Sequence, residues 1–170
     1  MKKQFLIITA LLLCQIIQAQ RDPIDELFNK YSGMEGFTYV SISGSMLNLI
    51  GSLDAENNPD NLMLRLSSIK ILSENDSLST VDINLYQEVS RKVNMSVYEE
   101  LMVVREGSNV TKFLIKQNGK TISELLVISG GTGGNSLILI RGDINLQDLA
   151  KLSDEIGIEE LEELEGIEDE

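Results

Sequence analysis

Four short apolar runs in the middle of the chain, joined by tight-turn sequences, constrain its fold more than any other feature. The runs cover residues 98–104, 110–116, 121–129 and 137–141. The segments between them are rich in glycine and asparagine, which tolerate the backbone angles of tight turns. Because strands joined by so few residues pair with their neighbours in the chain, the sequence predicts that these runs form an antiparallel meander.

Asn118-Gly119 is the most specific of the turn sequences. A type I′ hairpin turn needs positive φ at both central positions, and asparagine followed by glycine tolerates this best. We therefore expect this dipeptide to form the loop of a hairpin. Gly119-Lys120-Thr121 also resembles the end of a phosphate-binding loop, but that motif needs a glycine where the chain has Leu114. The sequence thus favours a hairpin turn over a phosphate site.

Helical and β-rich segments alternate before the meander, and another helix is expected after it. The first predicted helix is opened by Pro23, presents Ile24, Leu27, Phe28 and Tyr31 on one face, and ends at Ser32-Gly33. The next expected elements are a strand over residues 37–42, a helix over 46–50 and a strand over 69–73. A further helix is expected to carry Val81, Leu85, Val89 and Val93 on one face. The last expected helix is capped by Asn145 and ends at Gly157, and its inward residues are Leu146, Leu149, Leu152 and Ile156. Phe113 and Ile115 alternate with Lys112, Leu114 and Lys116, which predicts one covered sheet face with Leu114 on the outward side. We expect the α+β class: a mainly antiparallel sheet of about five or six strands with helices packed on one face.

Residues 1–19 have the pattern of a removable signal peptide. Lys2 and Lys3 precede an apolar stretch over residues 5–17, and the small residue Ala19 marks the expected cleavage position. The stretch is shorter than the roughly 20 apolar residues of a spanning helix, so we expect cleavage rather than a membrane span. Cys14 leaves a lipoprotein anchor as the alternative, which the bulky Leu13 before it disfavours. The sequence therefore predicts a periplasmic or secreted protein.

Removal of this peptide would leave an acidic chain without cysteine, histidine or tryptophan. The full chain has 14 basic and 27 acidic residues, and loss of Lys2 and Lys3 would change its net charge from −13 to −15 (12 minus 27). Such a charge repels nucleic acid and anionic lipid surfaces, so neither is an expected partner. The mature chain could form no disulfide, and histidine, the usual acid–base group near neutral pH, is absent.

About 150 mature residues suit a single domain, which we place at residues 20–158. The remaining segment, residues 159–170, contains eight acidic residues. Like charges three and four residues apart oppose helix formation, so a disordered tail is expected. An alternative is a docking helix formed on a basic partner, because apolar residues recur every three positions at Ile158, Leu161, Leu164 and Ile167.

Several short strings in a fixed order resemble the DUF4252 family of small exported Bacteroidetes proteins. They are Leu27-Phe28-Asn29-Lys30-Tyr31-Ser32-Gly33-Met34-Glu35-Gly36, Tyr98-Glu99-Glu100-Leu101-Met102, Asn118-Gly119-Lys120-Thr121-Ile122-Ser123-Glu124-Leu125 and Gly142-Asp143-Ile144. The resemblance covers the chain from about Asp25 to Ile158. It implies a bacterial envelope protein of a family without an established activity or catalytic residues. It also implies an association with genes for extracytoplasmic-function sigma factors.

Other motifs that suggest chemistry are incomplete. Asp54, Glu56, Asn58 and Asp60 alternate as calcium ligands do, but Pro59 replaces the glycine of such a loop and Arg65 its closing carboxylate. Ser67-Ser68-Ile69-Lys70 has the spacing of a serine–lysine pair, yet it lies in or beside a predicted strand rather than at a helix start. The glycine-rich residues 130–134 fit a hairpin loop better than an anion site, since no helix follows them. We assign no catalytic, cofactor-binding or metal-binding residues.

The sequence is typical of an exported, non-catalytic envelope protein that acts as a binding or regulatory module. Its expected partner is another envelope protein or a small ligand, bound through an open sheet face or the acidic tail. Two alternatives remain open: a histidine-free hydrolase that uses carboxylates or serine and lysine, and a weakly calcium-dependent surface protein.

Overall fold

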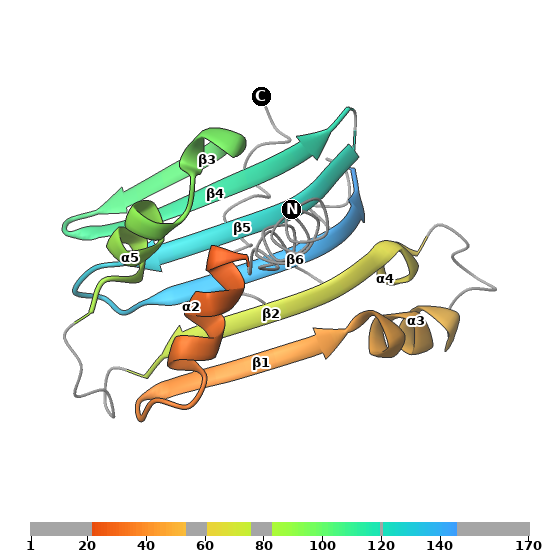
Figure 1. The fold of residues 1–170 in the computed structure, drawn as a ribbon, viewed down its shortest axis with the longest axis horizontal. Coiled ribbons are helices and arrows are strands. Elements are labelled where there is room, and N and C mark those ends of the chain that lie inside the picture. Colours follow the sequence, from red (N-terminus) through yellow and green to blue (C-terminus); the bar gives the residue numbers. More distant parts are fainter. Residues whose placement is uncertain (1–21, 54–60, 76–82, 120, 146–170) are drawn as a thin grey trace, which may run out of the picture.

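Six strands form one antiparallel sheet in the computed structural model (Figure 1). The structure describes residues 22–53, 61–75, 83–119 and 121–145. In chain order, the elements are α2 (Pro23–Tyr31), β1 (Phe37–Ser43), α3 (Gly44–Leu53), α4 (Leu62–Arg65), β2 (Leu66–Glu74), α5 (Leu85–Lys92), the short 3-10 helix η2 (Met95–Val97), β3 (Glu99–Glu106), β4 (Asn109–Asn118), β5 (Thr121–Gly130) and β6 (Ser136–Ile144). The predicted last helix, the tail, the signal peptide and the possible calcium loop lie outside the described residues.

The strand order is β1-β2-β6-β5-β4-β3, with every neighbouring pair antiparallel. Strands β3 to β6 form the predicted meander, which is therefore confirmed. β6 pairs with β2 on its other side, so the last strand in the sequence lies inside the sheet. As a result β1 and β3 are the two edge strands.

The β4–β5 turn differs from the predicted one by one position. Asn118 is the last residue of β4 and pairs with Thr121, so the loop begins at Gly119 and does not include Asn118. Gly119 has a φ of 69°, whereas no described residue other than glycine has positive φ. A bulge at Ser123, whose hydroxyl donates to the Lys116 carbonyl at 2.9 Å, shifts the register between the core and the turn. Core packing thus sets the loop position, and the type I′ assignment to Asn118-Gly119 is wrong.

Local signals explain where the helices begin. The Asp22 carboxylate accepts from the Ile24 N–H at 2.9 Å, and Pro23 occupies the first turn, where its missing N–H costs nothing. In α5, the Asn84 side chain accepts from the Gln87 N–H at 3.0 Å, so this helix begins at Leu85. The one-turn helix α4, capped by Asn61, was not predicted, because four residues are too few to show a helical period.

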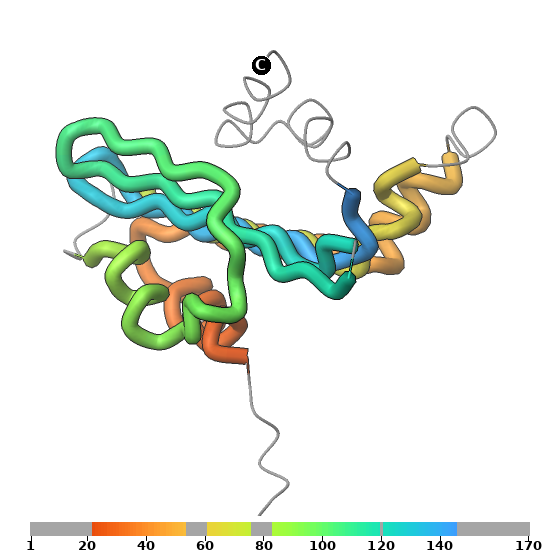
Figure 2. The backbone as a smooth tube through the Cα atoms, turned by 90° about the horizontal axis from the view of Figure 1, so that it is seen from above, coloured from red at the N-terminus to blue at the C-terminus, as the bar shows by residue number. Residues whose placement is uncertain are grey.

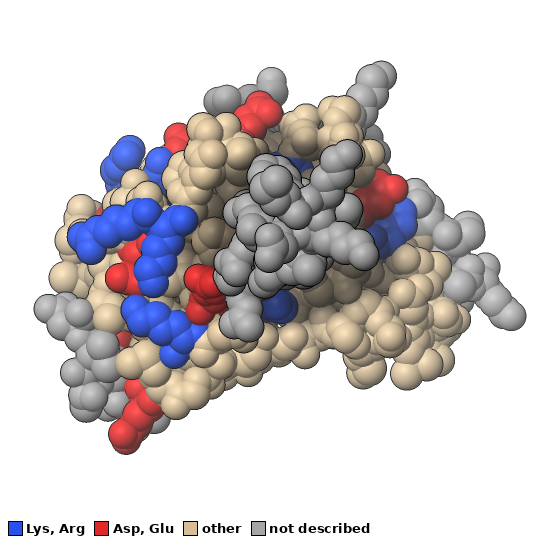
Figure 3. All heavy atoms as spheres, viewed as in Figure 1, with Lys and Arg blue, Asp and Glu red and all other residues tan. Residues whose placement is uncertain are grey.

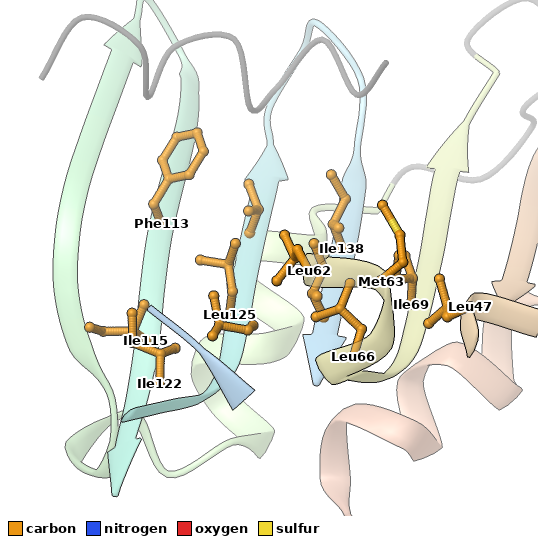
Figure 4. Packing of buried hydrophobic residues seen from close by; sticks show 13 residues of the cluster. Leu47, Leu62, Met63, Leu66, Ile69, Phe113, Ile115, Ile122, Leu125 and Ile138 are labelled. Atoms are coloured by element: carbon orange, nitrogen blue, oxygen red, sulfur yellow. The ribbon is translucent and has the colours of Figure 1, made fainter. Parts of the chain in front are cut away.

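Side chains of the inner strands alternate between two apolar clusters on opposite faces of the sheet. One cluster contains Leu125, Val127, Ile138 and Ile140 together with Leu47 of α3 and Leu62 and Met63 of α4. Figure 4 shows Leu47, Leu62 and Met63 close to Ile69 and Ile138 of the sheet. The other cluster contains Leu126, Ile128, Leu137 and Leu139 together with Ile24, Leu27 and Phe28 of α2 and Leu85 and Val89 of α5. We call these the α3/α4 face and the α2/α5 face.

The α+β class and the antiparallel sheet with helices packed against it are thus confirmed, but the helices do not share one face. Figure 2 shows α2 and α5 on one side of the sheet and α3 and α4 at its far end. The prediction of one covered face treated Leu114 as outward, like the lysines beside it. Leu114 is buried in the α2/α5 cluster, because that face also carries helices.

Candidate functional site

The most concentrated set of charged side chains surrounds Arg141 on the α2/α5 face. Its Nε donates to Glu124 Oε2 at 2.7 Å, and its Nη1 donates to Asp25 Oδ2 at 3.0 Å. Its Nη2 pairs with the Asp22 carboxylate. Arg141 and Glu124 are register partners on β6 and β5, while both aspartates come from the start of α2. One guanidinium therefore joins two inner strands to the start of a helix, and Arg141 and Asp25 are 116 residues apart in the chain.

Two further side chains complete this group, which we call the Arg141 cluster: Asp22, Asp25, Lys70, Tyr98, Glu124 and Arg141. Lys70 on β2 donates to Asp25 Oδ1 at 2.7 Å. The Tyr98 hydroxyl, just before β3, donates to Glu124. Glu124 is 5% exposed, so its charge requires these partners.

The surroundings shift the pKa values of three members of the cluster: Asp25, Tyr98 and Arg141. Burial raises the pKa of Asp25, but hydrogen bonds and charges from Lys70 and Arg141 outweigh it and leave that pKa below its usual value. Burial also lowers the pKa of Arg141, yet Glu124 and Asp25 outweigh this and raise it. Burial first, and then the hydrogen bond to Glu124, raise the pKa of Tyr98 well above its usual value.

This arrangement suits a structural role better than proton transfer. A general acid or base needs a pKa near the working pH, whereas the pKa values of Asp25 and Tyr98 move away from neutrality. Within the residues that the structure describes, no group of three or more Asp, Glu, Cys or His side chains is placed to hold a metal ion. The Arg141 cluster therefore fixes α2 to the sheet. Sequence reasoning missed it because its members come from five separate segments.

A polar hollow of about 410 Å³ lies where the β5–β6 loop meets the ends of β1 and β2. Its lining residues are Thr38, Ser73, Glu74, Asn75, Ser129, Gly133, Gly134, Asn135 and Ser136. The Asn135 side chain is already bonded: Oδ1 accepts from the Leu85 N–H at 2.6 Å, and Nδ2 donates to Glu74 and to the Ile83 carbonyl. The Asn135 amide is therefore occupied within the protein, whereas the buried Ser136 hydroxyl, which also lines the hollow, has no hydrogen-bond partner among the described residues.

The glycine-rich β5–β6 loop closes on Asn109 rather than on an anion. The Gly133 N–H donates to Asn109 Oδ1 at 2.8 Å. A side chain at Gly131 would place its Cβ 2.7 Å from the Asn109 Cα, so the glycine allows a close approach of two backbones. The predicted hairpin loop is confirmed, and at least one of its amides is occupied within the protein.

The serine–lysine spacing also has a structural explanation. Ser67 and Ser68 lie in β2, and Lys70 on the same strand is paired with Asp25. That chemistry seats its serine at a helix start, where the lysine can reach it. The prediction that this serine lies in or beside a strand is confirmed.

One segment of the described chain carries no charge at all. Residues 37–53, which form β1 and α3, contain no Asp, Glu, Lys or Arg, although charged residues make up 24% of the chain. Figure 3 shows the visible surface over α3 and the adjoining end of β1 without blue or red atoms. We call residues 37–53 the uncharged segment.

Helix α3 within this segment is apolar on two sides. Leu47 and Gly51 face the core, where the Leu64 side chain leaves no room for a Cβ on Gly51. The opposite side carries Met46, Leu49, Ile50 and Leu53, which are 49%, 59%, 42% and 82% exposed. Positions i, i+3, i+4 and i+7 lie on one helical face, so these four residues form a continuous exposed row. We call it the α3 stripe.

The inner strands do not offer the open sheet face that the sequence suggested as a binding surface. The inner strands bury apolar side chains on both of their faces, so neither face is open there. Sequence reasoning identified α3 but not its exposure, which depends on where the neighbouring strands lie. Among the described helices, none is long and apolar enough to cross a membrane.

Comparison with known proteins gives a family but no activity. Residues 31–152 match the model of a domain of unknown function, DUF4252. A search of curated proteins and a search of solved structures each returned no match. The family model spans most of the chain and includes every described strand. The chain therefore belongs to the DUF4252 family, as its short motifs indicated.

Proposed function

We propose that this protein is a non-catalytic binding module of the cell envelope that docks another protein through the α3 stripe. The observation that carries the proposal is the row of four exposed apolar side chains on a helix without charge. Large exposed apolar rows are rare on proteins that work alone and mark interaction sites. The tight pairing within the Arg141 cluster supports a non-catalytic role.

The energy available from the stripe fits a specific but reversible contact. Full burial of a Leu or Met side chain contributes about 1.5–3 kcal/mol, and the stripe residues have roughly half of that still to gain. Leu53, at 82% exposed, gains the most. Together the four residues would supply several kcal/mol, part of which offsets the entropy lost on association.

The charge of the chain defines the chemistry of the partner. An apolar helix face fits an apolar groove, the common mode for helix recognition. The groove would have a basic rim, because the full chain has a net charge of −13 and Asp54 directly follows α3. An anionic membrane surface is a poorer partner, since α3 has no lysine or arginine to contact its headgroups.

The test is crosslinked co-purification from intact cells with charge placed on the stripe. We expect Leu49→Lys/Leu53→Lys to lose the proteins that the native chain captures, because two charges cannot enter an apolar groove. The matched control is Val97→Lys, which replaces another exposed apolar residue, 48% exposed, on η2. Both variants should keep the native melting temperature. Identical capture by all three proteins would refute docking through α3.

Export is a separate part of the proposal with its own measurement. The signal-like residues 1–19 support it, and cleavage near Ala19 predicts a mature N-terminus at Gln20. Cell fractionation reports the compartment of the protein, and mass measurement of the intact protein reports the cleavage position. An uncleaved chain in the cytosol would contradict export, and a lipid-modified Cys14 would replace the soluble form with an anchored one.

A further inference from the structure

We propose that two copies of this protein pair edge to edge through β1, antiparallel, so that one continuous sheet crosses both. This inference is independent of the proposed function. It uses the backbone of β1 and the side chain of Val40, and none of the four residues of the α3 stripe. The partner is a second copy of the same chain.

The two edges of the sheet are built differently. Edge strand β3 carries Glu99, Glu100, Arg105 and Glu106 and has a register shift between Glu100 and Met102. Charges and bulges on an edge strand are the usual protection against pairing with another chain. Edge strand β1, Phe-Thr-Tyr-Val-Ser-Ile-Ser, has no charge and no proline and pairs with β2 over its whole length without a bulge. Only β1 is thus left open to a further strand.

The hydrogen-bond pattern shows which groups of β1 point outward. The Asn75 N–H donates to the Gly36 carbonyl at 2.7 Å, so Gly36 directs its backbone groups toward β2. Backbone direction alternates along a strand. Val40 therefore bonds toward β2, whereas Tyr39, Ser41 and Ser43 direct their N–H and C=O groups away from the sheet.

These outward backbone groups can pair with the same groups of a second copy related by a two-fold axis. Full antiparallel overlap of β1 with its copy places Phe37 opposite Ser43 and Tyr39 opposite Ser41 of the second copy. The Tyr39–Ser41 pairs bring outward-facing backbone groups together, as a ladder requires, whereas the Phe37 N–H already donates to the Met34 carbonyl at 3.2 Å. Val40 then lies opposite Val40 of the second copy at a non-hydrogen-bonded position, where Cα atoms are about 4.5 Å apart and side chains are closest. Val40, apolar and 40% exposed, would be covered there.

Repulsion between two acidic copies is weaker at this uncharged edge than at a contact made of acidic residues. Two chains of net charge −13 repel each other, and the cost is smallest where the contact itself carries no charge. The uncharged segment, residues 37–53, meets that condition. A basic partner, in contrast, would gain nothing from an edge without acidic residues.

Two substitutions on β1 test the pairing without touching its bonds to β2. Ser41→Pro removes an outward N–H, a place where edge strands accept proline. Val40→Lys places a charge at the two-fold axis.

The control is again Val97→Lys. In sedimentation velocity of the purified protein at about 1–100 µM, a range typical of reversible association, we expect the dimer mass for the native chain and for Val97→Lys. We expect the monomer mass for both β1 variants. If Ser41→Pro does not fold, Val40→Lys decides alone.

A crosslink tests the register itself. The only native cysteine is Cys14, so a Cys14→Ser background leaves a single engineered thiol. Val40→Cys should form a disulfide-linked dimer on mild oxidation, because opposed Cα atoms about 4.4–6.8 Å apart allow a disulfide. Val97→Cys, similarly exposed, should remain monomeric on the same non-reducing gel.

A native chain that is monomeric throughout, or a Val40→Lys variant as dimeric as the native chain, would overturn the inference. A monomeric chain whose β1 variants lose a captured protein would overturn it too, and would give the edge to a foreign peptide. If the native chain is monomeric and Leu49→Lys/Leu53→Lys loses the captured partner, the dimer is refuted and the proposed function stands. If the native chain dimerises through β1 but Leu49→Lys/Leu53→Lys still captures every protein that the native chain captures, the dimer stands and the proposed function is refuted.

Discussion

The Arg141 cluster gives the sharpest stability prediction, because one guanidinium holds three carboxylates. Arg141→Met removes the cation but keeps most of the side-chain volume. Glu124, 5% exposed on an inner strand, is then left with the Tyr98 hydroxyl as a partner, and Asp22 loses its ion pair. Asp25 retains Lys70 at 2.7 Å. The main cost is therefore the uncompensated charge of Glu124.

The size of the effect follows from burial. Breaking a fully buried ion pair costs about 3–5 kcal/mol, whereas exposed pairs contribute about 0–1 kcal/mol. The Arg141 side chain is 23% exposed and that of Glu124 is 6% exposed, which places this pair nearer the buried limit. We expect Arg141→Met to lower the free energy of unfolding by about 2–4 kcal/mol. Glu124→Gln, which keeps an acceptor for Tyr98, should cost about 1–2 kcal/mol.

The test is a double-mutant cycle measured by urea unfolding at neutral pH. In Arg141→Met/Glu124→Gln no buried charge remains unpaired at this position, so the double variant should be more stable than the sum of the single effects predicts. We expect a coupling free energy of about 1–3 kcal/mol. The slope of unfolding free energy against urea should stay constant, because the surface exposed does not change. Additive effects within about 0.5 kcal/mol would show that the cluster does not act as a buried ion pair.

Two further predictions concern acid stability and backbone packing. The pKa of Asp25 is lower in the folded protein than in the unfolded chain, so its contribution is present above about pH 4 and is lost as pH falls through the folded value. The difference in unfolding free energy between the native chain and Asp25→Asn should therefore shrink between about pH 5 and pH 2, and a constant difference would contradict it. Gly142→Ala would place a methyl carbon 2.6 Å from the Arg65 carbonyl oxygen, and should lower the melting temperature by several degrees, about 1–3 kcal/mol in stability. Gly33→Ala, which meets no heavy atom within 4 Å, is the matched control and should leave the melting temperature nearly unchanged.

Features fixed by neighbouring residues could be predicted from the sequence. The buried face of α2, with Ile24, Leu27, Phe28 and Tyr31, follows from helical spacing and a proline at the start. The strands of the meander follow from apolar runs and glycine turns, since each pairs with the next. In both cases the information lies within a few residues of the element.

Features fixed by distant segments could not be predicted. The placement of β6 between β2 and β5 depends on pairing across about half of the chain, and nothing in its own sequence names β2 as a neighbour. The Arg141 cluster has the same origin: Arg141 and Asp25 are 116 residues apart. One local signal existed, since Glu124 and Arg141 both interrupt otherwise apolar strands. A charged residue inside a buried strand requires a partner, although the sequence does not say which.

The uncharged segment shows how the two kinds of information combine. A helix with apolar residues on two sides is expected to bury both of them, and the sequence of α3 indicates such a helix. The position of the sheet allows Leu47 to be buried and leaves Leu53 in solvent, so the described residues cover only one of the two sides. The strand just before it, β1, is likewise the edge without charge or bulge. The net charge of −13 opposes contact between copies, and within the described residues this adjoining uncharged segment offers a place where that cost is small. Substitutions that add charge at Val40 or Leu53 should therefore change what the protein binds while leaving its stability within about 0.5 kcal/mol of the native value.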